Sequence, residues 1–339
     1  MHIPDGYLGP ETLAVGWAAS APVWYVAGRK VKKIISKPKA VPVLAASAAF
    51  SFLVMMLNVP VLGGTTAHAV GATLIAVIAG PWVAVLAVTA ALAVQAVLFG
   101  DGGLLSFGIN CLNMAIIMPF AGYAIYQLIA GNSDLRSGRR LLAAGVGSYF
   151  AIVLAAFVVG IELGIQPLLH TVNGVAQYSP YGLGTTIPAM TLSHMAIAGP
   201  VEAAFTVGVL AFLTRTSPEL FSVERRVSAK LRSFYGLIAV LVIATPLGLL
   251  ATGTAFGEWS GDELAKRIGY VPHGLAKLGD VWAGLLPDYG QSHAAGALAI
   301  ALYVVSAIIG VAVLSAVVWL IVRLVRRRAA RRNEGLTPS

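Results

Sequence analysis

Charged residues and cysteine are both scarce in this sequence. Only 11% of the 339 residues are charged, against about 25% in an ordinary soluble domain, while 58% are hydrophobic. The single cysteine, Cys111, excludes a disulfide within the chain and any cysteine metal cluster. The sequence also lacks a glycine-rich loop ending in Gly-Lys-Ser/Thr, and it lacks His-Glu-x-x-His. These absences argue against ATP binding by that loop and against a membrane metalloprotease.

An export signal is missing from the start of the chain. The first ten residues read MHIPDGYLGP, with no basic start and no early apolar core, so they do not match a cleavable signal peptide. We therefore expect Met1 to be the mature N-terminus. Pro4 restricts its own backbone and favours an extended Ile3, and Asp5-Gly6 favours a tight turn. The opening residues are thus predicted to form a short, rigid, polar segment.

Long apolar runs dominate the rest of the sequence, and several approach the roughly 20 residues that span a bilayer. They predict an all-α polytopic membrane protein with about nine transmembrane helices, a seven-helix block followed by a two-helix unit. The predicted spans are Pro10–Ala27, Val41–Val61, Thr66–Gly80, Trp82–Phe99, Leu104–Ile129, Leu141–Ile165, Thr186–Leu213, Phe234–Thr252 and Ala294–Ile321.

These spans divide the chain into three parts. Residues 1–213 would form the first block, 214–233 a basic cytoplasmic linker, and 234–339 a two-span unit with a long extracytoplasmic loop. Within that loop, SGDELAKR predicts a short helix capped by Ser260 or Asp262.

The net charge of +9 does not indicate binding to nucleic acid, because the basic residues follow the order of the spans. Twenty of the 23 Lys and Arg residues fall in alternate connections or in the C-terminal tail. Only Lys266, Arg267 and Lys277 fall on the opposite side. The positive-inside rule then predicts an N-terminus outside and a C-terminus in the cytoplasm.

A free N-terminus followed by histidine is a ready chelator. The amine of Met1, the amide nitrogen of His2 and the His2 imidazole can enclose one metal ion in a five-membered and a six-membered ring. Three nitrogens in one plane leave a vacant corner that a second histidine can fill. Nickel(II) and copper(II) favour such square-planar nitrogen sites, whereas zinc prefers tetrahedral ligation. The rigid turn at Pro4 and Gly6 would hold this chelator in place.

His68 is the candidate second histidine. The third predicted span is short, and Gly63-Gly64 before it favours an irregular backbone, which is tolerated at membrane depth where it is buried in protein or lines a cavity. His68 is expected just inside the outer end of this helix, in the wall of an outward-facing pocket. Taken alone, an incidental His2 and a hydrogen-bonded interior His68 are the alternative interpretations.

Three segments together are distinctive: MHIPDGYL, VPVLGGTTAHAVG and QAVLFGDGGLLSFGINCLNMA. Over residues 1–213 they resemble the NikM/CbiM family, the substrate-specific (S) components of energy-coupling-factor nickel and cobalt transporters. The resemblance implies metal ligation by Met1, His2 and His68. The C-terminal unit resembles, more loosely, the companion component NikN or CbiN, or the related PDGLE-type extension. The opening MHIPDG resembles the nickel branch, and cobalt import for cobalamin synthesis is the alternative.

The resemblance also implies partners and a location. It implies a multi-pass protein of the cell membrane that imports Ni²⁺ or Co²⁺ together with an energy-coupling transmembrane (T) protein and two cytoplasmic ATPases. The chain itself would be a transporter subunit and not an enzyme, and it would need no cofactor. No nucleic-acid partner is expected.

Other polar residues within or beside the spans are candidates for supporting roles. Asp101 is expected to orient a ligand histidine, since metal-bound imidazoles usually donate their second N–H to an acceptor. Asn110 would either brace the N-terminal segment or bridge neighbouring helices, and His194 would support the site from the seventh span. Intramembrane Glu162 and Glu202 suggest a rival function, a self-sufficient metal/proton carrier that uses them with His194 as relays. For Glu202, a hydrogen-bonded structural role is the favoured interpretation.

Overall fold

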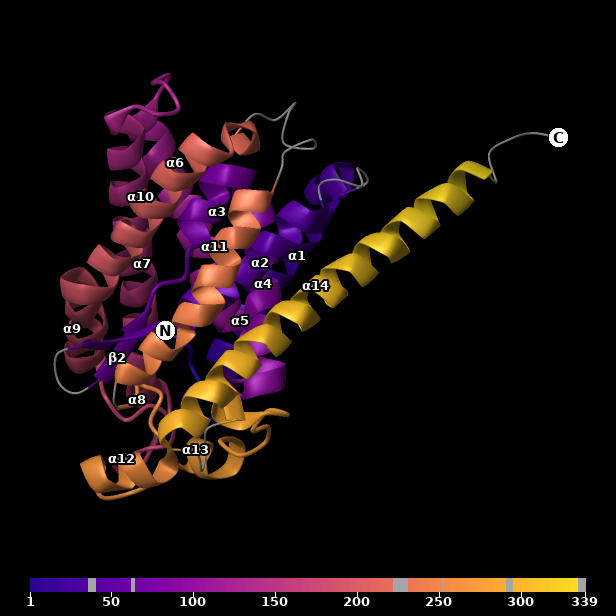
Figure 1. The fold of residues 1–339 in the computed structure, drawn as a ribbon. Helices are drawn as coiled ribbons and strands as arrows, with labels where there is room; N and C mark the ends of the chain where they lie inside the picture. Colours follow the sequence, from indigo (N-terminus) through magenta and orange to yellow (C-terminus); the bar gives the residue numbers. More distant parts are fainter. Residues whose placement is uncertain (36–40, 62–64, 222–230, 252, 291–294, 335–339) are drawn as a thin grey trace.

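The computed structural model describes residues 1–35, 41–61, 65–221, 231–251, 253–290 and 295–334, and it is almost entirely helical (Figure 1). The first block contains α1 (Pro10–Ile35), α2 (Val41–Met55), β1 (Asn58–Val61), β2 (Thr65–His68), α3 (Ala72–Ala79), α4 (Pro81–Val94), η2 (Gln95–Phe99), α5 (Phe107–Asn110), η3 (Cys111–Ile117), α6 (Met118–Ala130), α7 (Gly138–Gly164), α8 (Gln166–Leu169), β3 (Thr171–Val172), β4 (Val175–Ala176), α9 (Leu183–Ser193), η4 (His194–Ala198), α10 (Gly199–Thr216) and η5 (Pro218–Phe221). The C-terminal unit contains α11 (Arg232–Ala244), η7 (Thr245–Leu250), α12 (Gly261–Ile268), α13 (His273–Leu278), η8 (Pro287–Gly290) and α14 (Gly296–Glu334).

The helices form a polytopic membrane protein, as the apolar runs predict. Each of the nine predicted spans contains a helix. Within the described ranges, six segments are long and apolar enough to cross a membrane: 81–99, 107–130, 138–169, 183–216, 232–250 and 296–324. The two units share one apolar core, in which Phe234 of α11 lies against Phe50 of α2.

The prediction of continuous helices over residues 41–61 and 66–80 is wrong in part. The helix α2 ends at Met55, and β1 and β2 form an antiparallel hairpin that pairs Asn58 with His68. The Asn-Val-Pro-Val and Thr-Thr stretches explain this, because proline lacks the amide that a helix needs and β-branched residues favour strands. His68 therefore ends a strand, and it does not lie on a helix. Residues 62–64, with the predicted Gly63-Gly64 irregularity, lie outside the described ranges.

Among the described elements, three are widened, π-helical turns: η2, η3 and η4. Such turns are rare and occur frequently at functional sites. Gln95 begins η2, Asn110 directly precedes η3 and His194 begins η4. Each of these polar side chains is buried.

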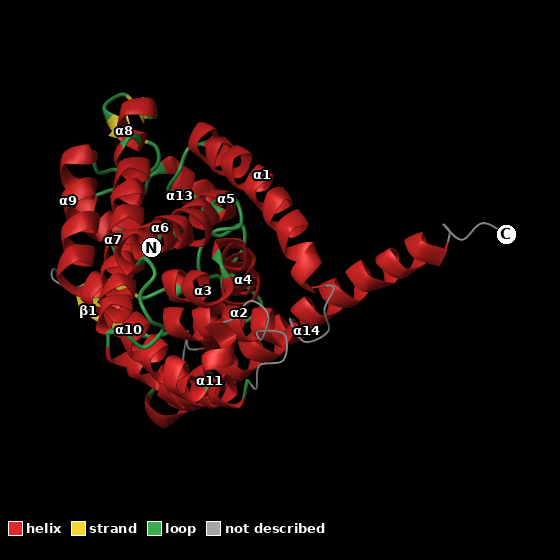
Figure 2. Ribbon diagram, turned by 90° about the horizontal axis from the view of Figure 1, so that it is seen from above, coloured by secondary structure: helices red, strands yellow, loops and turns green. Residues whose placement is uncertain are grey.

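The C-terminal unit covers one end of the bundle. The helices α12 and α13 lie below the other helices in Figure 1, and α14 runs obliquely along α2 and away from the bundle. Ser260 caps α12 and forms a capping box with Glu263, as the sequence predicts. Seen from above, the N-terminus lies among the helices of the first block (Figure 2).

Candidate functional site

The first residues are folded into the protein. Met1 and His2 are each only 4% exposed. Asn110 bonds both backbone groups of Ile3: its Oδ1 accepts from the amide at 2.8 Å and its Nδ2 donates to the carbonyl at 3.1 Å. The carboxylate of Asp5 accepts two further amides, from Leu104 and Ser106, each at 3.0 Å. The N-terminus is therefore held by the loop and helix that follow α4.

Gly6 allows this fold because a residue with a side chain would be strained and would clash at this position. Its φ is +90°, a conformation that L side chains rarely adopt. A Cβ at this position would lie 2.6 Å from the Cα of Leu275 in α13. The next residue, Tyr7, donates its hydroxyl hydrogen to the carbonyl of Trp259 at 2.7 Å. The opening turn thus packs directly against the C-terminal unit.

Nitrogen atoms of Met1, His2 and His68 converge at one point. The Met1 amine lies 3.3 Å from Nε2 of His68, and that Nε2 lies 3.1 Å from Nδ1 of His2. The other ring nitrogen of His68 donates to the carbonyl of Ala69 at 3.0 Å. The other ring nitrogen of His2 lies 3.3 Å from Oε1 of Gln95, to which it donates. Nδ1 of His2 and Nε2 of His68 therefore face each other, with the Met1 amine beside them.

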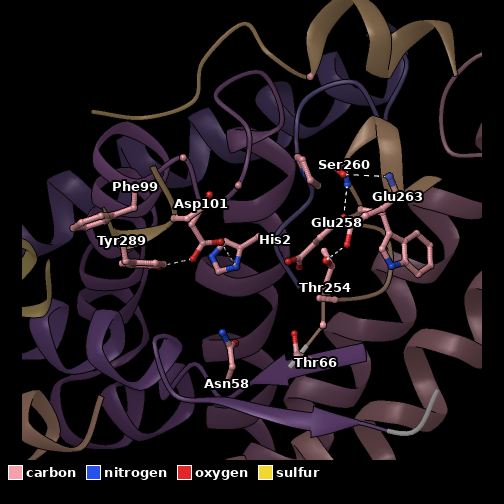
Figure 3. A pocket seen from close by; sticks show the side chains of 18 of the residues that line it. His2, Asn58, Thr66, Phe99, Asp101, Thr254, Glu258, Ser260, Glu263 and Tyr289 are labelled. Atoms are coloured by element: carbon pink, nitrogen blue, oxygen red, sulfur yellow. Dashed lines mark hydrogen bonds and ion pairs between the residues drawn. The ribbon is translucent and has the colours of Figure 1, made fainter. Parts of the chain in front are cut away.

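Two acidic side chains flank this cluster (Figure 3). Oδ1 of Asp101 lies 3.3 Å from Nδ1 of His2. Oε1 of Glu258, from the C-terminal unit, lies 3.4 Å from the Met1 amine, and its carboxylate also accepts the His2 backbone amide. Burial and the adjacent ammonium lower the pKa of His2 to about 3, so the ring is neutral at pH 7. Burial raises the pKa of Glu258 to about 7.

The cluster opens into a cavity of about 910 Å³ between the two units. Seven of the residues that the structure describes place carboxylates in its lining: Asp5, Asp101, Glu258, Asp262, Glu263, Asp280 and Asp288. Within the described chain, neither Lys nor Arg lines it. The cavity is therefore strongly anionic, although the whole chain carries a net charge of +9.

In the described part of the chain, the remaining candidates form their hydrogen bonds away from the nitrogen cluster. His194 donates from Nδ1 to the carbonyl of Met190 at 2.8 Å, and its Nε2 has no partner in the described part of the chain. Glu202 accepts the amides of Val70 and Gly71 at 2.7 and 3.0 Å. Glu162 accepts from Asn113 at 2.7 Å. Glu202 thus has the hydrogen-bonded structural role that the sequence favoured.

Three residues of the site escaped the sequence reasoning. Gln95 is a polar residue inside an apolar span, and this alone is only a weak indication of a functional role. Glu258 and Tyr289 come from the long loop of the C-terminal unit, where nothing in the sequence points to the N-terminus. In the described chain, no three His, Cys, Asp or Glu side chains form a metal cluster by themselves.

Two family models match successive parts of the chain. The family described as "Cobalt uptake substrate-specific transmembrane region", CbiM, matches residues 2–220, and the PDGLE domain matches residues 231–327. The fused nickel transport protein NikMN of Rhodobacter capsulatus is 43% identical over 335 residues, which span 93% of this chain and 95% of that protein.

Two solved structures are also similar. One, described as a transition metal transporter, is 48% identical with a TM-score of 0.60, and the match covers 67% of this chain and 98% of that one. The other, a truncated transition metal transporter, is 51% identical with a TM-score of 0.59, and the match covers 64% of this chain and 99% of that one.

Proposed function

Because this chain belongs to the CbiM family of substrate-specific transmembrane regions and carries a PDGLE domain, we propose that it captures Ni²⁺ for ATP-driven import. The proposed ligands are four nitrogen atoms: the Met1 amine, the His2 amide, Nδ1 of His2 and Nε2 of His68. The chain is a transport component and not an enzyme, in agreement with its relatives. The metal is therefore a cargo and not a cofactor.

The convergence of the Met1 amine, Nδ1 of His2 and Nε2 of His68 carries the proposal. Neighbouring donors on a square-planar ion are about 2.9 Å apart if each bond is about 2.0–2.1 Å long, the usual length for imidazole on zinc. The observed separations of 3.1 and 3.3 Å are slightly wider. A contraction of a few tenths of an ångström would close the site on an ion.

The ligand chemistry favours nickel. Three nitrogens of the first two residues lie in one plane only when the His2 amide loses its proton, and nickel(II) accepts such planar nitrogen ligation whereas zinc(II) prefers a tetrahedron. The name of the fused nickel transport protein from Rhodobacter capsulatus supports the same metal. The description of the matching family, cobalt uptake, makes Co²⁺ the second candidate.

We further propose that ATP hydrolysis is supplied by partners, an energy-coupling transmembrane protein and two cytoplasmic ATPases. The chain has no Gly-Lys-Ser/Thr phosphate loop of its own. The rival self-sufficient carrier would need Glu202 as a proton relay, but this carboxylate is occupied by two backbone amides. Metal uptake that persists without ATPase partners would favour the self-sufficient carrier.

Calorimetry on the detergent-purified protein tests the ligand set. Nickel and cobalt are titrated into the native chain, into a form with one extra residue before Met1, and into His68→Ala. We expect tight nickel binding by the native chain, a loss of at least 100-fold in both altered forms, and weaker cobalt binding throughout. Equal binding by the native and extended forms would show that the Met1 amine is not a ligand.

A further inference from the structure

We propose that the groove between α7 and α10 binds an anionic phospholipid, with an acyl chain in the groove and the phosphate headgroup on Arg139 and Arg215 at its end. Three observations support this site: the apolar lining of the groove, the arginines that continue its two walls, and the lack of acidic partners for them in the described chain. The site is separate from the nitrogen cluster, so it does not depend on the proposed metal ligands.

The groove is apolar and opens toward the lipid. It has a volume of about 540 Å³, and all its lining residues come from α7 and α10. Leu142 and Phe150 line it and are exposed on the surface of the protein. It is deep at Gly145, where an added Cβ would lie 3.0 Å from Val207. Both helices belong to segments that are long and apolar enough to cross a membrane, so the groove opens into hydrocarbon.

The width of the groove favours an acyl chain as its occupant. The helices α7 and α10 pack directly against each other, and the axes of packed helices lie about 8–10 Å apart. The furrow between two such helices is narrower than a third helix, which with its side chains is about 10–12 Å across. A single hydrocarbon chain therefore fits into the furrow more fully than a helix of another protein does.

Arginines continue both walls of the groove toward one end. Residues three or four positions apart lie on the same face of a helix. Arg139 precedes Leu142 of the groove by three residues on α7, and Arg215 follows Val207 by eight residues, or two steps of four, on α10. Nε of Arg136 donates to a carbonyl in the last turn of α10 at 3.1 Å, which ties the turn before α7 to that end. The arginines thus gather where the groove ends.

These arginines are arranged to bind an anion. Nε of Arg139 donates to the carbonyl of Ile129 at 2.6 Å, so this side chain, like Arg136, is anchored to the main chain. None of the ion pairs in the described part of the chain involves Arg136, Arg139 or Arg215, although Asp134 lies in the same turn. The planar guanidinium group of arginine can bind two phosphate oxygens at once. A phosphate headgroup is therefore a matching ligand for this end of the groove.

The position of the arginines in the membrane agrees with a lipid. In Figure 1, this end of the bundle lies opposite α12 and α13. It carries the basic connections that the positive-inside rule assigns to the cytoplasm. The cytoplasmic leaflet contains anionic lipids, and basic pockets between membrane helices on this side bind lipid headgroups. One amphipathic molecule thus accounts for both the apolar groove and the cationic end.

Native mass spectrometry of the detergent-purified full-length chain tests the headgroup contact. The probes are phosphatidylglycerol, which is anionic, and phosphatidylcholine, which is zwitterionic, with the same acyl chains. We expect the unaltered chain to retain phosphatidylglycerol preferentially. The double variant Arg139→Gln, Arg215→Gln should bind it at least tenfold more weakly, since each basic residue near an anionic surface contributes roughly fivefold in affinity. The control is Arg29→Gln, Arg323→Gln, which removes the same charge from α1 and α14, outside the groove.

A second pair of variants tests the groove itself. Ala203→Leu places a branched side chain in the groove, whereas Ala204→Leu adds the same side chain to an exposed position that does not line it. Thermal unfolding in phosphatidylcholine micelles shows whether each variant is folded. We expect Ala203→Leu to lose most of its phosphatidylglycerol binding and Ala204→Leu to keep it.

Several results would overturn the inference. Equal retention of the two lipids by the unaltered chain would show that the headgroup is not recognised. An equal loss in the control double variant would indicate a diffuse effect of net charge. If inorganic phosphate raised the unfolding temperature as much as phosphatidylglycerol, the groove would not be needed. If Arg139→Gln, Arg215→Gln abolished metal uptake in cells without changing lipid binding, the arginines would serve a protein partner instead.

Discussion

At the scale of single residues, the buried His2 makes the docking of the N-terminus sensitive to pH. Its pKa is lowered to about 3 in the folded chain, against an ordinary value of about 6.5 when the segment is released. At a pH between these two pKa values, His2 carries an extra proton in the released state and is neutral in the docked state. Docking is therefore most favourable above pH 6.5. Its free energy becomes less favourable as the pH falls, by up to about 2 kcal/mol at pH 5.

Thermal unfolding of the metal-free protein at pH 7 and pH 5 measures this effect. His2→Phe is the control, because it keeps a buried ring that does not titrate. Glu258, with a raised pKa of about 7, contributes in the opposite direction and is present in both chains. We expect the unaltered chain to lose more thermal stability on acidification than His2→Phe. Equal losses would mean that His2 is protonated in the folded state.

Gly6 sets how closely the N-terminus approaches the C-terminal unit. Gly6→Ala would place a methyl group 2.6 Å from the Cα of Leu275, at a φ of +90°. We expect the segment to undock and the nickel affinity to fall at least tenfold, measured by calorimetry. Gly28→Ala in α1 is the control, since no atom lies within 4 Å of the added group. If both variants bind alike, the turn at Gly6 does not position the ligands.

At the scale of elements, Glu202 joins α10 to the hairpin that carries His68. Its carboxylate accepts the amides of Val70 and Gly71, at the beginning of α3. Hydrogen bonds to a charged group contribute about 1.5–3 kcal/mol each. We expect Glu202→Ala to lower the stability by about 3 kcal/mol and to weaken nickel binding through the displaced hairpin. Thermal unfolding and calorimetry measure the two effects.

The control for Glu202 is Glu11→Ala. Glu11 is 68% exposed and pairs with His170 at 3.0 Å, and an exposed pair contributes little. A Glu202→Ala chain with unchanged stability would show that the two amides do not depend on this carboxylate.

Only some of these elements could be predicted from the sequence. Apolar runs located the helices, and local chemistry located the cap at Ser260, because both depend on residues close in sequence. The strands β1 and β2 escaped because their apolar residues resemble those of the helices on either side. The contacts of Gln95 and Tyr289 escaped for another reason, since no spacing rule relates residues 194 positions apart. Met1, His2 and His68 were indicated by their ligand chemistry and by a family resemblance, and their ligation of metal remains a prediction.

At the scale of the whole molecule, the anionic cavity predicts how fast the ion arrives. Carboxylates lining a cleft raise the local concentration of cations, and salt screens this attraction. We expect the double variant Asp262→Asn, Asp280→Asn to lower the nickel association rate a few-fold at low salt, measured by stopped-flow. The dissociation rate should stay nearly unchanged, because neither residue contacts the nitrogen cluster.

Asp134→Asn is the control for that experiment, because Asp134 lies in the turn between α6 and α7, away from the cavity. The same association rate in the double variant and the control, at every salt concentration, would exclude steering by the cavity.

The contacts between the two ends of the chain impose an order of assembly. Tyr7 and its partner Trp259 are 252 residues apart, and Glu258 and Tyr289 lie still farther along the chain from the first two residues. At synthesis rates of about 5–20 residues per second, roughly 10–50 s pass between the synthesis of the N-terminus and the synthesis of these partners. The first residues to leave the ribosome are thus among the last to reach their final positions. If the proposed ligands are correct, tight nickel capture is a property that only a finished molecule acquires.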